Sequence, residues 1–485
     1  MKMLQSTIAA PVWSHFSTIC SIPHPSKHEQ QLADWIINWA NKKNLNCVQD
    51  EIGNLILKKP ASKGYEDKTP VILQAHLDMV PQKNNNVTHD FLTDPIKPVI
   101  DGEWLRAENT TLGADNGIGM AACLAVLADN TLQHGPLEVL LTSDEETGMT
   151  GAFGLKKDAL QGKILLNTDS EQEGELYVGC AGGINVNVAL PYEIMESEPT
   201  DSAFEITLEA LKGGHSGCDI NLGRANAIKT LVSILHNFDA IPFNISYFEG
   251  GSLRNAIPRE ASCVIVCAPH YQNSLEMIIN TLQQKLCSEF KASEPGLLLS
   301  IKSCDLPGFI LTHQSQTNLL NSLQHCDNGV FSMDNTFSDV VQTSSNLGVV
   351  AQNRNNPRVF DIQVLVRSQI EKEKQTIAQK IAGNFEKHGA KVLLQGDYPG
   401  WTPNKDSAVY RIMEQQYVAL FAKKPKAMVI HAGLECGLFS ANYPQWDMIS
   451  FGPTIKFPHS PDEKVNIASV DKFWQLLLAT LKAID

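Results

Sequence analysis

The chain has 485 residues, of which 43% are hydrophobic and 19% are charged. At roughly 150 residues per domain, this length excludes a single small module, and the composition excludes a collagen-like or disordered chain. The chain has 53 acidic and 39 basic residues, so its formal net charge is -14. Such a surface repels phosphate backbones and anionic lipids, so we expect no nucleic-acid partner.

Neither a membrane-spanning segment nor a secretion signal is expected. The longest uninterrupted apolar run, at 120–128, is far shorter than the roughly 18 residues of a membrane-spanning helix. The N-terminal segment is polar where a signal peptide would carry its apolar core. The 11 cysteines form no CxxC pair and stand in apolar contexts, which predicts buried, reduced thiols. We therefore expect a cytoplasmic protein that does not bind membranes.

Helical and strand patterns alternate over the first 180 residues. Apolar residues at helical spacing predict an amphipathic helix over 28–41, and a second helix begins near Asn116. Short apolar runs predict strands at 71–75, 137–143 and 163–168. This alternation predicts an α/β domain with a central, mostly parallel sheet flanked by helices.

The pattern changes after the glycine-rich segment CAGGI at 180–184. Alternating apolar and polar residues then predict half-exposed antiparallel strands, followed by mixed helices and strands. The turn-rich segment GDYPGWTPN at 396–404 marks a second boundary. We therefore expect a first domain formed by 1–184 and 400–485, interrupted by an inserted α+β domain formed by 185–399.

Chemically active side chains stand where strands of the first domain end, which is where open α/β sheets place ligand sites. His76 and Asp78 in VILQAHLDMV are two residues apart, so both project from one face of an extended strand. Glu145 and Glu146 follow LEVLLTSD, and Asp169 closes KILLNTD. Adjacent carboxylates leave a strand end in different directions, so one can bind a ligand while the other acts as a base.

Each of these segments also has an ordinary structural explanation. His76 can be a hydrogen-bonded core histidine, Asp115 in TLGADNGIGMAA can cap a helix, and the acids at 144–146 can form a solvated loop. The glycines around Asp115 lack the GxGxxG spacing, so no nucleotide site is predicted. The combination of segments, and not any one of them, favours a functional site.

The order of these residues resembles the ligand order of the di-zinc exopeptidase family that includes acetylornithine deacetylase, tripeptidase T and the cytosolic dipeptidases. That order is HxD, a bridging Asp, adjacent Glu-Glu, a further Asp and a distant C-terminal His. It is met by His76, Asp78, Asp115, Glu145, Glu146, Asp169 and His459. The segments IPHPSKHE, QAHLDMV, LGADNGIG, TSDEETGMTGA, LKGGHSG and FPHSPDEKV resemble the branch of the family that cleaves Xaa-His dipeptides, over nearly the full length.

The resemblance implies two Zn²⁺ ions per chain, for which Co²⁺ or Mn²⁺ can substitute. The implied ligands are His76, Asp115, Glu146, Asp169 and His459. Asp115 would bridge the ions, with His76 and Asp169 on one side. Glu146 and His459 would complete the other side. Zinc accepts both imidazole and carboxylate ligands, which fits this set.

The resemblance also implies how a peptide bond would be hydrolysed. Asp78 would orient the imidazole of His76. Glu145 would take a proton from a water that bridges the metals and deliver it to the leaving amine. The implied substrates are short peptides, above all Xaa-His dipeptides, including those of the beta-Ala-His type.

For the inserted domain, the resemblance implies a lid and dimerisation domain of a homodimer. His215 in LKGGHSG would reach the site of the partner subunit and bind the developing oxyanion. Asn255 would bind substrate, and Arg367 would hold its C-terminal carboxylate. Gly433 in HAGLE would contact the substrate through its backbone.

Other functions remain open at this point. An amidohydrolase acting on N-acyl amino acids would use the same metal chemistry, and a non-catalytic dimeric binding protein could keep the fold. A serine hydrolase is not favoured because GGHSG lacks the GxSxG arrangement. A cysteine hydrolase is not favoured because Cys436, near His431, has apolar neighbours.

Overall fold

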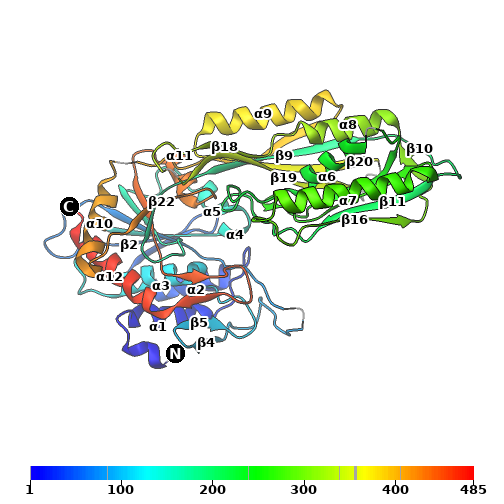
Figure 1. Cartoon of the computed structure of the whole chain (residues 1–485). Helices are drawn as coiled ribbons and strands as arrows, with labels where there is room; N and C mark the ends of the chain where they lie inside the picture. Colours follow the sequence, from blue (N-terminus) through cyan, green and yellow to red (C-terminus); the bar gives the residue numbers. More distant parts are fainter. Residues whose placement is uncertain (1, 85, 239, 338, 354–357, 405) are drawn as a thin grey trace. The chain divides into compact units, whose positions relative to one another are not determined.

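The computed structural model of the chain describes residues 2–84, 86–238, 240–337, 339–353, 358–404 and 406–485. The chain divides into two compact units, which are coloured along the sequence in Figure 1. Unit 1 comprises Met1–Cys180, Trp401–Val429 and Leu434–Asp485. Unit 2 comprises Ala181–Gly400 and Ile430–Gly433.

The central sheet of unit 1 is parallel at its centre. Its strands are β1 (Asn46–Gln49), β2 (Leu55–Lys59), β3 (Val71–His76), β6 (Leu137–Thr142), β7 (Ile164–Asn167), β8 (Glu175–Cys180), β22 (Lys426–Ile430) and β23 (Asp447–Ser450). Their order is β1-β2-β6-β3-β7-β23-β8-β22, and β6, β3, β7 and β23 run parallel. All residues of β3, β6 and β7 are buried, as expected for parallel strands covered on both faces.

Helices surround this sheet. They are α1 (Ala10–Cys20), α2 (Gln30–Lys42), α3 (Ala114–Ala128), α4 (Glu145–Gly148), α5 (Thr150–Gly154), α10 (Ala408–Phe421), α11 (Glu435–Asn442) and α12 (Ile467–Ala483). The α/β domain predicted from the sequence is confirmed, and its central sheet is mixed, because the pairs β1–β2, β2–β6 and β23–β8 are antiparallel. A second sheet of unit 1 has the order β24-β25-β5-β4, formed by β4 (Pro98–Asp101), β5 (Trp104–Ala107), β24 (Ile455–Lys456) and β25 (Lys464–Asn466).

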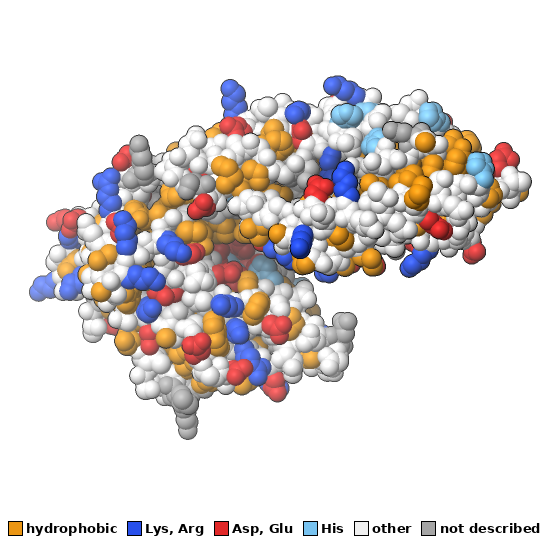
Figure 2. Space-filling model, viewed as in Figure 1, with side chains coloured by type: hydrophobic (Ala, Val, Ile, Leu, Met, Phe, Trp, Pro, Cys, Tyr) orange, Lys and Arg blue, Asp and Glu red, His pale blue; other side chains and the backbone are white. Residues whose placement is uncertain are grey.

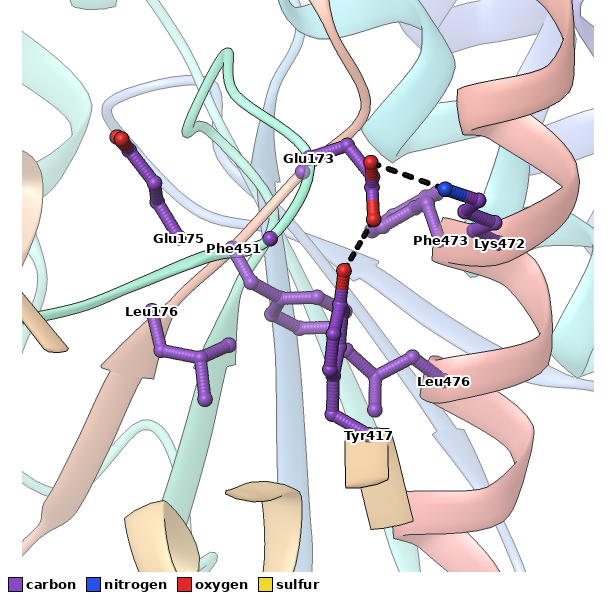
Figure 3. A pocket seen from close by; sticks show the side chains of 10 residues that line it. Glu173, Glu175, Leu176, Tyr417, Phe451, Lys472, Phe473 and Leu476 are labelled. Carbon is purple, nitrogen blue, oxygen red and sulfur yellow. Dashed lines mark hydrogen bonds and ion pairs between the residues drawn. The ribbon is translucent and has the colours of Figure 1, made fainter. Parts of the chain in front are cut away.

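The start of β8 is fastened to α10 and α12 by one carboxylate. Glu173 accepts a short hydrogen bond from the hydroxyl of Tyr417 on α10. It also pairs with the ammonium group of Lys472 on α12, 3.2 Å away. Figure 3 shows both bonds beside a small pocket that Phe451 and Leu476 also line. The arrangement ties the second and third chain segments of unit 1 to the first.

Unit 2 contains a long antiparallel sheet with the order β16-β11-β15-β13-β19-β20-β9-β21, and β18 pairs with β19. These strands are β9 (Gly182–Pro191), β11 (Ser202–Glu209), β13 (Asn244–Gly250), β15 (Ala261–Cys267), β16 (Leu298–Cys304), β18 (Gly329–Met333), β19 (Val341–Gln352), β20 (Val359–Ser368) and β21 (Lys391–Tyr398). Shorter pairs join β10 (Ile194–Glu196) to β17 (Phe309–Leu311) and β12 (Gly214–His215) to β14 (Ala256–Ile257).

Helices lie along the sheet of unit 2 (Figure 1). They are α6 (Ala227–Leu235), α7 (Gln272–Glu289), α8 (His313–Gln324) and α9 (Glu371–Lys387). Their buried side chains and those of the strands form one hydrophobic core, with Leu231, Leu275, Leu319 and Phe385 among its helical members. The predicted antiparallel sheet and α+β character of this region are confirmed.

The unit boundaries differ in detail from the predicted ones. Residues 181–184 were predicted in the first domain, but the structure places them in unit 2 because β9 begins there and pairs with the end of β20. A Cβ atom on Gly182 would lie 2.5 Å from the backbone nitrogen of Gly400, so only glycine allows these segments to approach so closely. The return of Ile430–Gly433 to unit 2 was not predicted, because four residues leave no compositional signal.

Surface apolar residues and cysteines add two observations. Figure 2 shows hydrophobic side chains over the part of unit 2 that carries β10 and β11 in Figure 1, where Met195 and Phe309 are exposed. The eleven cysteines, all within the described residues, are not joined in disulfides. The prediction of buried thiols is wrong for three of them, which are exposed: Cys218, Cys287 and Cys304. Among the described residues, every helix is too short or too polar to cross a membrane.

Candidate functional site

Parallel pairing brings the predicted residues of unit 1 to one edge of the sheet. His76 is the last residue of β3, which lies between β6 and β7 in parallel register. Glu145 and Glu146 open α4 directly after β6, and Asp169 follows β7 by two residues. Because the carboxyl ends of parallel strands meet at the same edge, these side chains become neighbours.

The two carboxylate oxygens of Asp115 face two different histidines. Its Oδ1 lies 3.2 Å from Nε2 of His76, and its Oδ2 lies 3.2 Å from Nε2 of His459. The alternative explanation, a helix-capping Asp, does not account for these contacts, because both oxygens of Asp115 face histidine side chains. Asp115 therefore has the position of a residue that bridges two groups.

Each side of Asp115 has a further carboxylate. On the first side, Asp169 Oδ1 is 3.3 Å from Nε2 of His76 and accepts a 2.5 Å hydrogen bond from the amide of Asn116. On the second side, Glu146 Oε2 is 3.0 Å from Nε2 of His459. Asn116, which directly follows Asp115, is a residue of this site that was not predicted.

Two overlapping clusters could each hold a metal ion. The ligand atoms of His76, Asp115 and Asp169 all lie within 4.8 Å of one another, and so do those of Asp115, Glu146 and His459. This division matches the one implied by the resemblance. The ligand atoms of Glu145, His76 and Glu146 also lie within that distance, so distance alone does not assign the roles of the two glutamates.

The donor set fits divalent cations. Imidazole nitrogens combined with carboxylate oxygens suit zinc and similar borderline metals. The Oε1 atom of Glu146 is buried without a hydrogen-bond partner in the structure. A buried carboxylate oxygen without a partner is costly unless a cation or donor satisfies it.

The pKa values of this site reflect crowded acids. Burial, followed by the nearby charge of Asp169, raises the pKa of Glu145 well above its ordinary value. Burial and Asp115 raise the pKa of Glu146 to about 7. Burial lowers the pKa of His459, but its hydrogen bonds to Asp115 and Glu146 outweigh that effect and raise it to about 11. A group of acids with raised pKa values is typical of a site that receives positive charge from a ligand.

Asp78 holds the turn that carries the two glutamates. Its carboxylate accepts hydrogen bonds from the backbone N–H of Glu145 at 2.9 Å and of Glu146 at 3.2 Å. The hydroxyl of Ser26 donates a third, at 2.8 Å. Sequence reasoning missed Ser26, although it lies within the segment IPHPSKHE that carried part of the resemblance.

A buried polar network lies under the same sheet edge. Glu435 accepts hydrogen bonds from Gln74 on β3, at 2.5 Å, and from Thr142 on β6, at 2.8 Å. Burial raises the pKa of Glu435 to about 8. These residues were not predicted, because polar side chains inside apolar strands carry no motif. The network links β3, which ends at His76, to β6, which precedes the turn that carries Glu145.

Two of the predicted substrate-binding residues, His215 and Arg367, lie close together in unit 2. Nη2 of Arg367, at the end of β20, lies 3.5 Å from Nε2 of His215. Nη1 of Arg367 donates a 2.9 Å hydrogen bond to the hydroxyl of Tyr398 on β21. Burial and the Arg367 charge lower the pKa of His215 to about 4, against the opposing effect of Asp219. His215 is therefore neutral at pH 7, and Tyr398 is an additional residue of this group.

Asn255 and Gly433 lie beside these residues in different ways. The backbone carbonyl of Asn255 accepts a hydrogen bond from Ser216, next to His215, while its side chain is exposed. A Cβ atom on Gly433 would lie 3.0 Å from the Tyr398 ring. Contact of Asn255 and Gly433 with substrate stays a prediction.

The fold and the clusters at the sheet edge define the class of metal-dependent hydrolases. A profile of the peptidase family M20/M25/M40 matches residues 72–483. The chain belongs to that family. The expectation of a peptidase, and of the exopeptidase fold with an inserted domain, is thereby confirmed.

Relatives of known name match over the full length. The cytosol non-specific dipeptidase of Escherichia coli (strain K12) is 48% identical over 486 residues, which cover 100% of this chain and 99% of that protein. The crystal structure of the aminoacylhistidine dipeptidase of Vibrio alginolyticus has a TM-score of 0.89 at 46% identity, over 99% of this chain and 98% of that one. Aminopeptidase PepT of Bacillus cereus shares the fold, with a TM-score of 0.57 at 15% identity over 98% of both chains.

Proposed function

We propose that this chain is a di-zinc dipeptidase that hydrolyses the peptide bond of short peptides, above all Xaa-His dipeptides, including the beta-Ala-His type. One observation carries the chemistry: Asp115 turns its two oxygens to His76 and His459, each of which has a further acid beside it. The dipeptide substrate is supported by the names of the full-length relatives, at 48% and 46% identity.

The proposed metal ligands are those predicted from the sequence. His76 and Asp169 hold one Zn²⁺, Glu146 and His459 hold the other, and Asp115 is shared. Bound Zn²⁺ lowers the pKa of water and polarises a carbonyl oxygen. Co²⁺ and Mn²⁺ accept similar ligands, so they substitute for zinc in this proposal.

Glu145 is the proposed proton carrier. It accepts a proton from the attacking water and returns it to the amine that leaves, as a general base and then a general acid. Burial and Asp169 raise its pKa well above the ordinary range, and a raised pKa suits a carboxylate that must both take and give a proton. Asp78 keeps Glu145 in place by accepting a hydrogen bond from the backbone N–H of Glu145. Asp78 also orients His76.

Residues of unit 2 are proposed to bind the substrate. The guanidinium of Arg367, held by Tyr398, binds the C-terminal carboxylate through paired hydrogen bonds. Neutral His215 donates a hydrogen bond to the developing oxyanion. Asn255 and Gly433 complete the binding site.

Assembly and location belong to the same proposal. We infer a homodimer, supported by apolar side chains exposed on unit 2, of which Phe331 and Met333 on β18 and Phe309 on β17 are examples. A cytoplasmic location is supported by the name of the Escherichia coli relative.

Metal analysis combined with a substrate panel tests the proposal. Elemental analysis should find close to two zinc equivalents per chain, and chelation should abolish activity that zinc, cobalt or manganese restores. The panel should contain Xaa-His dipeptides, beta-Ala-His, dipeptides without His, and N-acetyl amino acids. Fastest cleavage of Xaa-His supports the proposal, and preference for N-acetyl amino acids would show a deacylase. A fully active metal-free protein would refute the metal chemistry, and the absence of any turnover would favour a binding protein.

A further inference from the structure

A buried carboxylate outside the proposed ligand set joins two of its members. Glu463 is only 2% exposed. Its Oε2 accepts hydrogen bonds from the backbone N–H of Leu112 at 2.7 Å and of Gly113 at 2.9 Å. Its Oε1 accepts from Ala114 at 2.8 Å and from Asp115 at 3.2 Å. One side chain thus binds four consecutive N–H groups that lead into α3.

These bonds fix the backbone from which the bridging Asp115 projects. The N–H groups at the start of a helix have no partner within the helix, and they attract negative charge. A carboxylate satisfies all four at once, because each of its oxygens accepts two bonds. Charge-assisted bonds of this kind are stronger than those to a neutral acceptor.

Glu463 also lies on the loop that carries His459. The loop spans residues 457–463 between β24 and β25, and the backbone N–H of Glu463 bonds to the carbonyl of Ser460 within it. The side chain of His459 is 51% exposed, so little packing holds it. The Glu463 carboxylate therefore connects the exposed His459 loop to the segment of Asp115, although the two are more than 340 residues apart in sequence.

The first metal cluster shares Asp115 with the second but depends less on Glu463, because its other two ligands lie outside the loop. His76 is the buried last residue of β3, and Asp169 follows β7. Both are held by the paired strands of the sheet. Only the second cluster combines a ligand on the loop with a ligand on the segment that Glu463 joins to it.

We propose that Glu463 is a positioning residue that sets the metal affinity of the cluster formed by Asp115, Glu146 and His459. The proposal rests on the proposed two-metal function and deepens it. Glu463 touches neither metal nor substrate; it acts by fixing the distance between His459 and Asp115.

The test compares two stepwise affinities within one protein. Metal-free full-length protein is titrated with Co²⁺, whose visible absorption reports each binding step, and the steps are assigned with His459→Ala and His76→Ala. In Glu463→Gln one acceptor oxygen is replaced by an NH₂ group. That group is a donor, so it cannot bond to the backbone N–H groups that the oxygen held. The His459-dependent step should weaken by at least about 10-fold, as is common for residues behind a metal ligand, and the His76-dependent step, which shares Asp115, should weaken less.

Glu138→Gln is the matched control. Glu138 is also buried in unit 1 and accepts two backbone bonds, from Gln161 at 2.7 Å and Gly162 at 2.8 Å, at the other end of the sheet. The Glu138→Gln variant should leave unchanged the ratio of the metal affinities of the His459-dependent and His76-dependent steps. Glu463→Asp keeps the charge but shortens the side chain, so it should weaken the same step. Excess metal should restore the kcat of Glu463→Gln, which a misfolded site would not allow.

The outcomes separate the two proposals. Equal weakening of both steps, or no weakening, in Glu463→Gln would refute the positioning role while leaving the two-metal function intact. A wild-type protein without any His459-dependent step would refute both.

Discussion

The carboxylate of Asp78 accepts a hydrogen bond from the backbone N–H of Glu145 at 2.9 Å. The Nδ1 atom of His76, by contrast, lies 2.9 Å from the backbone carbonyl of Asp78 and 3.4 Å from its carboxylate. The imidazole is therefore oriented by the Asp78 backbone at least as closely as by its side chain. The side chain mainly holds the turn that presents Glu145 and Glu146.

Replacing Asp78 with Asn should therefore impair catalysis more than it impairs binding of metal to His76. The amide keeps one acceptor oxygen but loses the second, so one of the two N–H bonds to the turn is lost. We expect kcat to fall by about 10- to 100-fold while the His76-dependent metal step stays within threefold, which metal titration measures. Asp129→Asn is a control, because Asp129 binds the backbone N–H of Thr131 away from the site. Loss of metal with unchanged kcat in the reloaded protein would contradict this role.

The two adjacent glutamates should respond differently to the same change. In Glu145→Gln the proton carrier is lost, so turnover should fall by at least about 10²-fold with metal content intact. In Glu146→Gln the partner of His459 is lost, so metal content should fall toward one equivalent. Elemental analysis beside kinetics distinguishes them. If Glu145→Gln loses metal and Glu146→Gln does not, the roles are reversed.

Arg367 should make the enzyme depend on a free C-terminal carboxylate. An unblocked Xaa-His dipeptide should be cleaved, whereas its C-terminal amide should be a poor substrate, because the amide cannot form the paired charged bonds. Arg367→Lys should raise KM for the acid and narrow the difference between acid and amide. Arg411→Lys, at an exposed arginine of unit 1, should change neither. Equal cleavage of acid and amide by the wild type would remove Arg367 from this role.

The metal-free protein should lose stability as pH rises from 7 to 9. Burial, followed by neighbouring acids, raises the pKa of Glu171 to about 9, and burial raises that of Glu435 to about 8, from an ordinary 4.5. His459, at about 11, is also raised. Since the folded state binds more protons than the unfolded state in this window, the free energy of unfolding falls as pH increases.

Thermal unfolding measures this effect. Tm of the metal-free protein should be lower at pH 9 than at pH 7, and the Tm gain on adding Zn²⁺ should be larger at pH 9. Glu435→Gln removes one of the raised acids, so it should reduce the pH dependence without zinc. A Tm that rises with pH in the metal-free protein would show that the crowded acids do not dominate.

The sequence predicted the features that depend on local apolar patterns and on the order of the strands. Apolar runs located β3, β6 and β7 within a residue or two of their bounds, because a strand buried on both faces needs an unbroken apolar sequence. The site residues of unit 1 followed from their places at strand ends together with the resemblance. His459 depended on the resemblance alone, because it lies in a loop with no periodic pattern.

Contacts between distant segments could not be predicted from the pattern. In the sequence, Glu463 is an ordinary acidic residue in a charged segment. Its carboxylate reaches the N–H groups of α3 only in the folded chain. Ser26 likewise meets Asp78 across 52 positions of sequence. Tyr398 lies on a strand whose pairing with β9 places it beside Arg367, and its sequence context is an ordinary turn.

The last prediction is that His215 acts in the active site of the partner chain and not in that of its own chain. His215 and the metal cluster belong to different units of the chain. In a two-fold dimer, a lid from one subunit can complete the site of the other. We expect each active site to combine Glu145 of one chain with His215 of the other, and His215→Ala or Glu145→Gln to be nearly inactive as a homodimer.

Mixed dimers distinguish the two arrangements. When a His215→Ala chain pairs with a Glu145→Gln chain and His215 acts across the dimer, both defects meet in one site and the other site has neither. Activity should therefore return to up to about half of the wild-type value per heterodimer. If His215 acts within its own chain, each site keeps one defect and no activity returns.

Differently tagged, co-expressed chains purified as heterodimers allow the measurement. The control pairs a Glu145→Gln chain with a Cys218→Ala chain, which alters an exposed thiol near His215. Because that control retains His215 in both chains, it should recover half of the wild-type activity under either arrangement, so only the His215→Ala mixture decides between them.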